Sequence, residues 1–324
     1  MQMAWGYAPP LILESAIRHK VFDVLDAGPK MLDQLSEATG ASRRGLRAIA
    51  DALVGLELLA RTPDGAYTLT PESAAFLVSS KPSFQGGMIK HTSNQLMPVW
   101  LNLAEVVKTG KPVTAVNEEG QGAAFFQELV PDIFPMSYPA AQELAAHLGL
   151  EANAATSALD LAAGSGVWGI ALAQSAPSLR VTAVDWPEVI PVTQKIVARF
   201  GLTDRFTFSG GDLMSADFGT GHNVATLGHI LHSEGVTRSK SLLAKTFAAL
   251  ASGGTIAIQE FLVAPDRTGP PMGLIFAVNM LVNTDAGDTF SFEEISGWLS
   301  EAGFVNARTI PTHGPSPIIL ANKP

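Results

Sequence analysis

ALDLAAGSGVWGIALAQSAPSLRVTAVDWPE, residues 158–188, has a pattern that predicts the architecture of this chain. An apolar run ends at Asp160, small residues follow, and after a helix-like segment a second apolar run ends at Asp185. The order of strand, glycine turn, helix, strand and acid is typical of a βαβ unit that holds a nucleoside. Glycines let the backbone approach a ligand closely, and the second carboxylate can accept hydrogen bonds from both ribose hydroxyls.

The glycine turn alone fits more than one ligand. Gly164, Gly166 and Gly169 spell GxGxxG, the dinucleotide fingerprint, which is a weak signal by itself. A tight turn that binds nothing is a further alternative. Asp160, four residues before Gly164, favours a cationic ligand, because a carboxylate repels a pyrophosphate and attracts a sulfonium and an ammonium group.

From Asp160 onward the turn has the pattern DxAxGxG. This pattern is close to the DxGxGxG of S-adenosylmethionine (SAM) methyltransferases, with Ala162 in place of the first glycine. We therefore expect SAM as the cofactor, with Asp160, Ala163, Gly164 and Gly166 among the residues that bind it.

Composition limits the class of protein. The 324 residues are 47% hydrophobic and only 16% charged, enough chain for two domains and a large core. No cysteine is present, which excludes disulfides and zinc–thiolate sites and suits a cytoplasmic location. The net charge of −9 argues against nucleic acid as the main partner. We expect no membrane span and no signal peptide.

The N-terminal region has the pattern of a winged helix. Helical periodicity covers residues 9–27, 31–39 and 43–59, with Ser42 as a helix N-cap, and residues 60–70 form a short hairpin that turns at Asp64-Gly65. Winged helices often bind DNA. Residues 1–80, however, carry seven Lys and Arg against nine Asp and Glu, so a ligand-sensing DNA-binding regulator is only an alternative.

The rest of the chain predicts an α/β fold. Helices are expected at residues 84–110 and 137–149, and from residue 158 strands and helices alternate. Such alternation is typical of a Rossmann-like, mostly parallel sheet, and two extended runs at 304–311 and 316–322 predict a C-terminal antiparallel hairpin. We expect a mainly helical, winged-helix-like domain at residues 1–112 and a catalytic domain at residues 113–324.

Ligands of parallel sheets lie beyond the carboxyl ends of the strands, so the residues there are candidates for the site. Gly211, Asp212 and Leu213 follow the third strand, where Asp212 could accept a hydrogen bond from the adenine amine. A glycine-rich turn with a solvated acid is the alternative. Trp186, directly after Asp185, could stack on the adenine or belong to the core.

Two histidines follow the fourth strand. His229 and His232 lie three residues apart with no third metal ligand evident nearby, so we expect no metal site. A histidine in this position suits a general base, because the ordinary imidazole pKa is near neutral. Glu260, at the end of the fifth strand, could hold the tautomer of such a base, although a structural histidine and a solvated carboxylate are the alternatives.

Taken together, these residues resemble the SAM-dependent O-methyltransferases of the hydroxyindole and plant phenolic type, in particular their bacterial small-molecule relatives. The resemblance covers nearly the whole chain. Its most specific segments are LDLAAGSG (159–166), VDWPEV (184–189), GGDLM (210–214), HILHSEG (229–235) and EAGF (301–304). It implies an N-terminal winged-helix-like dimerisation domain, a homodimer formed through it, and a Rossmann-like catalytic domain.

The resemblance also implies roles for single residues. It makes His232, not His229, the catalytic base, and it makes Glu260 the first of two acids beside that base. The second acid belongs to the segment 286–294, where no glutamate falls in register and Asp288 is the nearest substitute.

The helix at 272–282 lines the acceptor pocket in relatives. Met272, Phe276, Asn279 and Met280 are therefore candidate acceptor-binding residues, and Asn279 is the polar member. An ordinary apolar helix is the alternative.

The predicted activity is methyl transfer from SAM to a hydroxyl of a small, aromatic or polyketide-like molecule. One alternative keeps the fold and SAM but catalyses decarboxylation, hydroxylation or cyclisation. Another is an NAD-dependent reductase, based on the literal GxGxxG pattern.

Overall fold

A computed structural model describes residues 3–117, 119–150 and 156–324. The chain divides into two compact units, Met1–Pro98 and Val99–Pro324. This division falls before residue 112, and the domain boundary predicted there stays a prediction.

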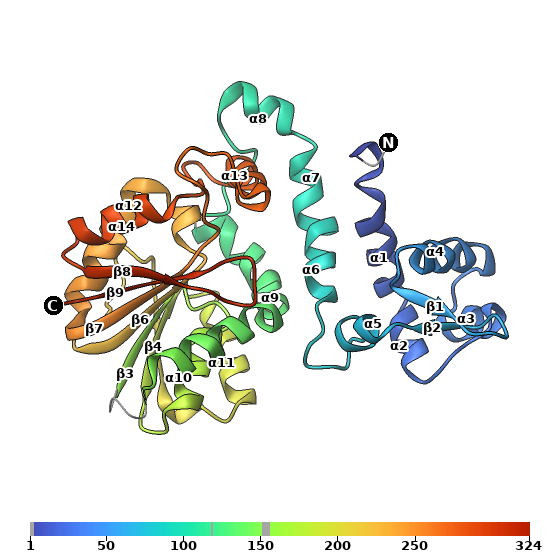
Figure 1. Ribbon diagram of the computed structural model, residues 1–324, viewed down its shortest axis with the longest axis horizontal. Coiled ribbons are helices and arrows are strands. Elements are labelled where there is room, and N and C mark those ends of the chain that lie inside the picture. The colour runs from blue at the N-terminus through green and yellow to red at the C-terminus, as the bar shows by residue number, and fades with distance from the viewer. Residues whose placement is uncertain (1–2, 118, 151–155) are drawn as a thin grey trace. The chain divides into compact units, whose positions relative to one another are not determined.

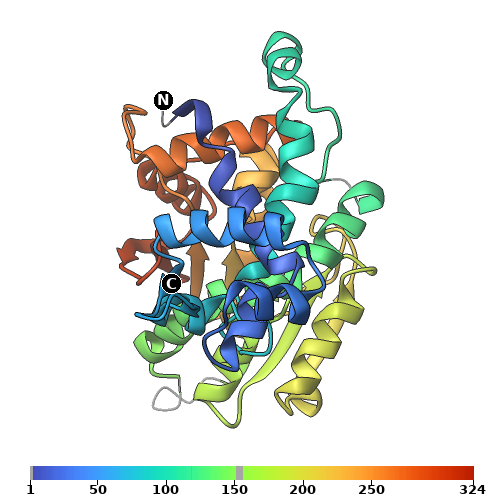
Figure 2. The same cartoon turned by 90° about the vertical axis from the view of Figure 1, so that its right-hand side faces the viewer.

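The first unit is helical with one small sheet, coloured blue to cyan in Figures 1 and 2. Its elements are η1 (Met3–Trp5), α1 (Ala8–Arg18), α2 (Val21–Asp26), α3 (Leu32–Thr39), α4 (Arg43–Gly55), β1 (Leu59–Arg61), β2 (Tyr67–Leu69), α5 (Pro71–Phe76), α6 (Gly86–His91) and η2 (Thr92–Leu96). The short helix α7 (Met97–Trp100) spans the division between the units.

Local backbone chemistry explains where these elements begin and end. Lys20 is left-handed (φ 57°) and separates α1 from α2, so the single helix expected over 9–27 is wrong. Ser42 caps α4 as predicted, accepting from the Gly45 N–H at 3.2 Å. The predicted hairpin is the antiparallel pair β1–β2, and its turn includes Gly65 at φ 89°.

The second unit is the α/β part of the chain. Its helical elements are α8 (Leu103–Thr109), α9 (Glu119–Leu148), α10 (Val167–Ser175), α11 (Ile190–Arg199), η3 (Thr203–Arg205), α12 (Leu231–Ala249), α13 (Pro271–Asn283) and α14 (Phe292–Glu301). Its strands are β3 (Ser157–Leu161), β4 (Arg180–Asp185), β5 (Phe206–Gly210), β6 (His222–Gly228), β7 (Leu250–Gln259), β8 (Val305–Ile310) and β9 (Ile318–Asn322).

These strands form one sheet in the order β5-β4-β3-β6-β7-β9-β8 (Figure 1). The pairs from β5 to β7 are parallel, and β9 pairs antiparallel with both β7 and β8. The predicted parallel sheet with a C-terminal antiparallel hairpin is therefore confirmed. The strand order reverses beside β3, and in open parallel sheets that reversal is where ligands bind.

Helices cover both faces of the sheet, which is why the central strands β3 and β6 are almost wholly buried. One face packs against α12 and α14 through buried side chains such as Leu243 and Leu299. The other packs against α9, α10 and α11 through buried side chains such as Leu144, Ile170 and Val197.

Helix α9 is much longer than the helix expected at 137–149. It contains Pro131, Pro135 and Pro139, each of which removes a backbone donor and normally ends a helix. Its buried residues, including Val130 and Leu144, pack it onto the rest of the unit, so tertiary contacts outweigh the local propensity that misled the prediction.

Helices over the predicted 84–110 segment are also shorter than expected. Three α-helices and a π-helical turn replace the single helix, with a break after Trp100. Among the described helices, none combines the length and apolar composition needed to cross a membrane.

Candidate active site

The loop after β3 has the backbone conformation that its small residues allow. Gly164 (φ 53°) and Gly166 (φ 72°) are left-handed, which glycine adopts without strain. Ala162, at the position where the resembling pattern has glycine, is left-handed as well (φ 50°) and is strained by its Cβ. The predicted ligand residue Ala163 lies in this loop, where its N–H donates to the Val184 carbonyl at 3.1 Å.

Asp160 lies beneath this loop and is fully buried. One of its carboxyl oxygens accepts from the Gly169 N–H at 2.9 Å and the other from the Thr226 hydroxyl at 2.8 Å. A Cβ at residue 169 would lie 2.7 Å from the Val181 side chain, so glycine is needed there. This geometry suits a residue that fixes the loop, and direct contact of Asp160 with a ligand stays a prediction.

Asp185 ends β4 and binds the same loop from the other side. One oxygen accepts from the Gly164 N–H and the other from the Trp186 N–H, both at 2.7 Å. Burial raises the pKa of Asp185 to about 6 and that of Asp160 to about 7. Neither carboxylate forms an ion pair with a described residue, so a bound cation would favour the ionised form of both.

Trp186 and Gly211 connect this loop to its neighbours. The Trp186 ring packs edge-on against Phe126 of α9, with ring centroids 5.9 Å apart. A Cβ at Gly122 would lie 2.6 Å from the same indole ring. The Gly211 N–H donates to the Asp185 carbonyl at 2.9 Å, which joins the ends of β4 and β5.

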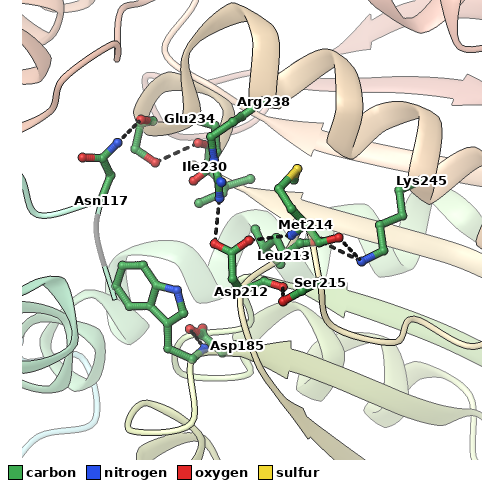
Figure 3. A network of polar contacts seen from close by, with 12 residues as sticks. Asn117, Asp185, Asp212, Leu213, Met214, Ser215, Ile230, Glu234, Arg238 and Lys245 are labelled. Carbon is green, nitrogen blue, oxygen red and sulfur yellow. Dashed lines mark hydrogen bonds and ion pairs between the residues drawn. The ribbon is translucent and has the colours of Figure 1, made fainter. Parts of the chain in front are cut away.

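Asp212 follows β5 and is held by two donors. One oxygen accepts from the Met214 N–H at 2.8 Å and the other pairs with the Arg238 guanidinium at 2.7 Å. Arg238 also binds Glu234 at 2.5 Å, so it bridges helix α12 and the loop after β5 (Figure 3). Burial raises the pKa of Glu234 above its usual range, and the charge of Arg238 opposes the shift.

Lys245, also on α12, holds the following residues of that loop. Its ammonium donates to the carbonyls of Leu213 at 2.8 Å and Met214 at 3.2 Å (Figure 3). The predicted ligand residues Asp212 and Leu213 are thus fixed by α12. Sequence reasoning missed Arg238, although its i,i+4 spacing from Glu234 on a helix could have indicated an ion pair.

His232 and Glu260 form a buried pair at the ends of β6 and β7. The ring nitrogen Nδ1 of His232 lies 2.8 Å from one Glu260 oxygen, and the His232 N–H donates to the other at 3.2 Å. Burial alone would raise the pKa of Glu260, but the charge and hydrogen bond of His232 outweigh it and lower that pKa. Nε2 of His232 has no hydrogen-bond partner among the described residues.

His229 has different surroundings although it lies three residues away. Its backbone is left-handed (φ 56°), and its Nε2 lies 3.1 Å from the Ser316 hydroxyl. Burial lowers the pKa of His229 to about 4, so the ring is neutral near neutral pH. It forms no hydrogen bond with a carboxylate in the described part of the chain.

The side chain of Asp288 is not brought to His232. Its carboxylate accepts from the Thr289 N–H at 2.7 Å and lies 3.5 Å from Arg267, and it is 46% exposed. Only its backbone N–H reaches the base segment, donating to the His232 carbonyl at 2.9 Å. The structure therefore joins Asp288 to the base segment through its backbone and its carboxylate to Arg267, and a role of that carboxylate as the second acid stays a prediction.

Helix α13 brings one of its four candidate residues to the base. The Phe276 ring lies edge-on to His232 and beside Phe261, with centroids 4.9 and 4.3 Å apart. The Asn279 amide oxygen accepts from the Trp100 indole at 3.0 Å and from Asn283 at 3.1 Å. Its NH₂ group has no hydrogen-bond partner among the described residues, and a contact with the acceptor stays a prediction. Met280 is buried, and Met272 is about half exposed.

Comparison with known proteins places this site in a family. Residues 100–305 match the O-methyltransferase domain, and residues 1–79 match the O-methyltransferase dimerisation domain. The chain is 30% identical to the tetracenomycin polyketide synthesis 8-O-methyl transferase TcmO of Streptomyces glaucescens, over 100% of this chain and 96% of that protein.

Two further relatives agree. One is the 3-hydroxy-5-methyl-1-naphthoate 3-O-methyltransferase of Streptomyces sahachiroi, which is 30% identical over 95% of this chain and 89% of that protein. The other is a solved structure, human N-acetylserotonin methyltransferase in complex with SAM. It superposes with a TM-score of 0.85 at 25% identity and covers 99% of this chain and 96% of that one.

Proposed function

The chain belongs to the family of SAM-dependent O-methyltransferases, and on that premise we propose that His232 is the general base that accepts the proton of the acceptor hydroxyl. The observation that carries this proposal is the buried pair of His232 and Glu260, joined at 2.8 Å. As in hydrolytic triads, an acid binds one ring nitrogen of a histidine and so fixes its orientation and tautomer.

The pair defines which ring nitrogen is free. With Nδ1–H donating to Glu260, the lone pair of Nε2 is available and accepts a proton from a hydroxyl within hydrogen-bond reach. The carboxylate then stabilises the imidazolium that forms. General-base catalysis of this kind contributes about 10²- to 10⁴-fold to the rate.

The donor site fits SAM by the chemistry of its residues. Asp160 and Asp185 have no cationic partner among the described residues, so the negative charge around this loop suits a sulfonium and an ammonium better than a pyrophosphate. We propose that Asp185 accepts from the ribose hydroxyls and that Asp212 and Leu213 contact the adenine. When bound, SAM supplies an electrophilic methyl carbon on a good leaving group, so the protein mainly aligns the reactants.

The acceptor is proposed to be a hydroxylated aromatic or polyketide-like molecule. Phe261 and Phe276 surround the His232 ring with aromatic surface that suits a flat apolar molecule. The names of the relatives TcmO and the naphthoate methyltransferase indicate acceptors of this kind. The family does not favour the non-methylating SAM enzyme or the NAD-dependent reductase.

The assembly and location are proposed from coarser findings. The match of residues 1–79 to a dimerisation domain supports a homodimer formed through the N-terminal unit. A cytoplasmic location agrees with the absence of cysteine from the sequence.

A screen of phenols, hydroxynaphthoates and aromatic polyketides with SAM tests the activity. The expected result is a product in which a methyl group replaces one hydroxyl proton, with an equimolar amount of S-adenosylhomocysteine (SAH). SAH formed without a methylated product, or a demethylated or decarboxylated product, would count against the proposal. Calorimetry with SAM and with NADH checks the cofactor, and only SAM is expected to bind.

A further inference from the structure

Asn117 lies on the segment between α8 and α9, and only one end of its side-chain amide has a hydrogen-bond partner among the described residues. Its Nδ2 donates to the Ser233 carbonyl at 3.3 Å. Its Oδ1 is buried and has no hydrogen-bond partner among the residues that the structure describes. Because a carbonyl only accepts, the bond to Ser233 fixes which end of the amide is nitrogen. The free atom is therefore an acceptor.

The neighbours of Asn117 place this free oxygen at the candidate active site. Ser233 directly follows the proposed base His232 on α12. The preceding residue Val116 donates its N–H to the carbonyl of Asn283, at the end of α13, at 2.8 Å. Figure 3 draws Asn117 with its hydrogen bond to the backbone of α12, in the same view as the donor-side residues Asp185 and Asp212.

Buried acceptors without a donor are rare in native proteins, and a donor from water or from a bound ligand is one explanation for such an atom. We propose that Asn117 Oδ1 accepts a hydrogen bond from an N–H or O–H group of a ligand bound in this site. The group belongs either to the methyl donor or to the hydroxylated acceptor. This inference rests on the proposed function, which places the methyl donor at the ends of β3, β4 and β5 and the acceptor at the ends of β6 and β7.

The variants Asn117→Ala and Asn117→Asp distinguish the role of Oδ1 from the role of the hydrogen bond to the Ser233 carbonyl, here called the tether to Ser233. Both lose the N–H that binds the Ser233 carbonyl, but Asn117→Asp keeps an acceptor oxygen of nearly the same shape. Thr114→Ala is the matched control, because Thr114 lies exposed on the same segment. Each variant is measured by calorimetric titration with SAH and by the KM for a phenolic acceptor at saturating SAM.

Asn117→Ala is expected to weaken binding of one ligand by about 3- to 10-fold, the size of one lost hydrogen bond. Asn117→Asp is expected to recover at least half of that loss on a logarithmic scale, and Thr114→Ala to match the wild type. A loss of SAH affinity assigns the contact to the methyl donor, and a raised acceptor KM assigns it to the acceptor.

Two results overturn the inference. Equal or larger losses in Asn117→Asp than in Asn117→Ala would mean that only the tether to Ser233 matters. Unchanged SAH affinity and unchanged KM in Asn117→Ala would mean that no ligand contacts the oxygen. Failure of the wild type to bind SAH or to methylate any phenol would instead count against the proposed function.

Discussion

The edge of the sheet that holds the proposed site has two halves, which differ in how their side chains are held. The donor half comprises the ends of β3, β4 and β5 with Asp160, Asp185 and Asp212. Each of these carboxylates accepts from a backbone N–H within nine residues of it or from the neighbouring loop. The acceptor half comprises the ends of β6 and β7, where His232 and Glu260 bind each other across 28 residues of sequence.

This difference suggests that the donor half serves to bind the cofactor and the acceptor half serves to transfer a proton. Backbone donors are fixed by the fold, so the donor half presents carboxylates of constant geometry, which suits a ligand that is always the same. The acceptor half adds a pair of side chains that can share a proton, together with the aromatic rings of Phe261 and Phe276. Variants in the two halves should therefore affect different measurements.

The largest effect is expected in the acceptor half. His232→Ala removes the proposed base and should lower kcat by about 10²- to 10⁴-fold. SAH affinity, which depends on the donor half, should stay within twofold of the wild type. Steady-state kinetics with SAH calorimetry measures both, and His229→Ala is the matched control with less than a tenfold loss of kcat. Equal kcat losses in the two variants would remove the contrast between these histidines.

Glu260→Gln tests whether the acceptor half works as a pair. The amide keeps the shape but can donate to Nδ1, which would leave the proton on Nε2 and block proton acceptance. We expect kcat to fall by about 10²-fold, with SAH affinity unchanged. A variant with wild-type kcat would show that the carboxylate does not orient the base.

Donor binding should depend on pH through the donor half. With a pKa of about 6, Asp185 is mostly protonated at pH 5, and cationic SAM favours its ionised form. SAM affinity measured by calorimetry should therefore rise about tenfold from pH 5 to pH 7. Asp185→Asn is the control that should flatten this dependence, and an affinity that falls with pH would contradict the assignment.

Asp185 and Asp160 predict that the stability of the ligand-free protein falls with pH, whereas its affinity for SAM rises. Their pKa values are raised to about 6 and 7 in the folded state, so folding favours the protonated forms. Their contribution to stability is present below the ordinary aspartate pKa and is lost as the pH rises through 6 to 7. Thermal unfolding with and without SAM should show that the stabilisation by SAM grows over this range.

A smaller effect on kinetics is expected for Arg238, which joins Asp212 of the donor half to Glu234 on α12. Arg238→Gln breaks the bridge between Asp212 and Glu234, which should raise the KM for SAM about fivefold and leave kcat within twofold, as expected of a partly exposed ion pair. Lys240→Gln on the same helix breaks only an exposed pair with Glu301 and is the control. A fall in kcat without a change in KM would place Arg238 in the acceptor half.

The smallest effect is expected for Asp288→Asn. Its carboxylate is partly exposed and faces Arg267, while the contact with His232 is made by the backbone, which the substitution keeps. We expect kcat to change by less than about twofold. A loss comparable to that of Glu260→Gln would restore Asp288 as a second orienting acid.

The two halves also differed in how far the sequence predicted them. The donor half was predicted from local motifs, because Asp160, Gly164 and Asp185 belong to one βαβ unit and the loop geometry depends on glycines close in sequence. The burial of Asp160 beneath that loop was not predicted, since spacing does not show which way a carboxylate points.

In the acceptor half, His232 and Glu260 were predicted from strand ends and family resemblance, and their contact required the fold. Asn117 had no sequence signal, because its contact with Ser233 spans 116 residues and begins from an irregular segment. The helix predicted at 137–149 begins at Glu119 in the structure, and Pro131 and Pro135, which normally end a helix, lie in the part that the prediction left out. Packing of α9 against α10, which a residue pattern does not show, stabilises the longer helix.

The central claim is that His232 and Glu260 act as one unit, and a double-mutant cycle on kcat tests it most directly. If they act together, Glu260→Gln should change kcat by less than about twofold once His232 is already alanine, although it costs about 10²-fold in the wild type. Effects that multiply in the double variant would contradict the account.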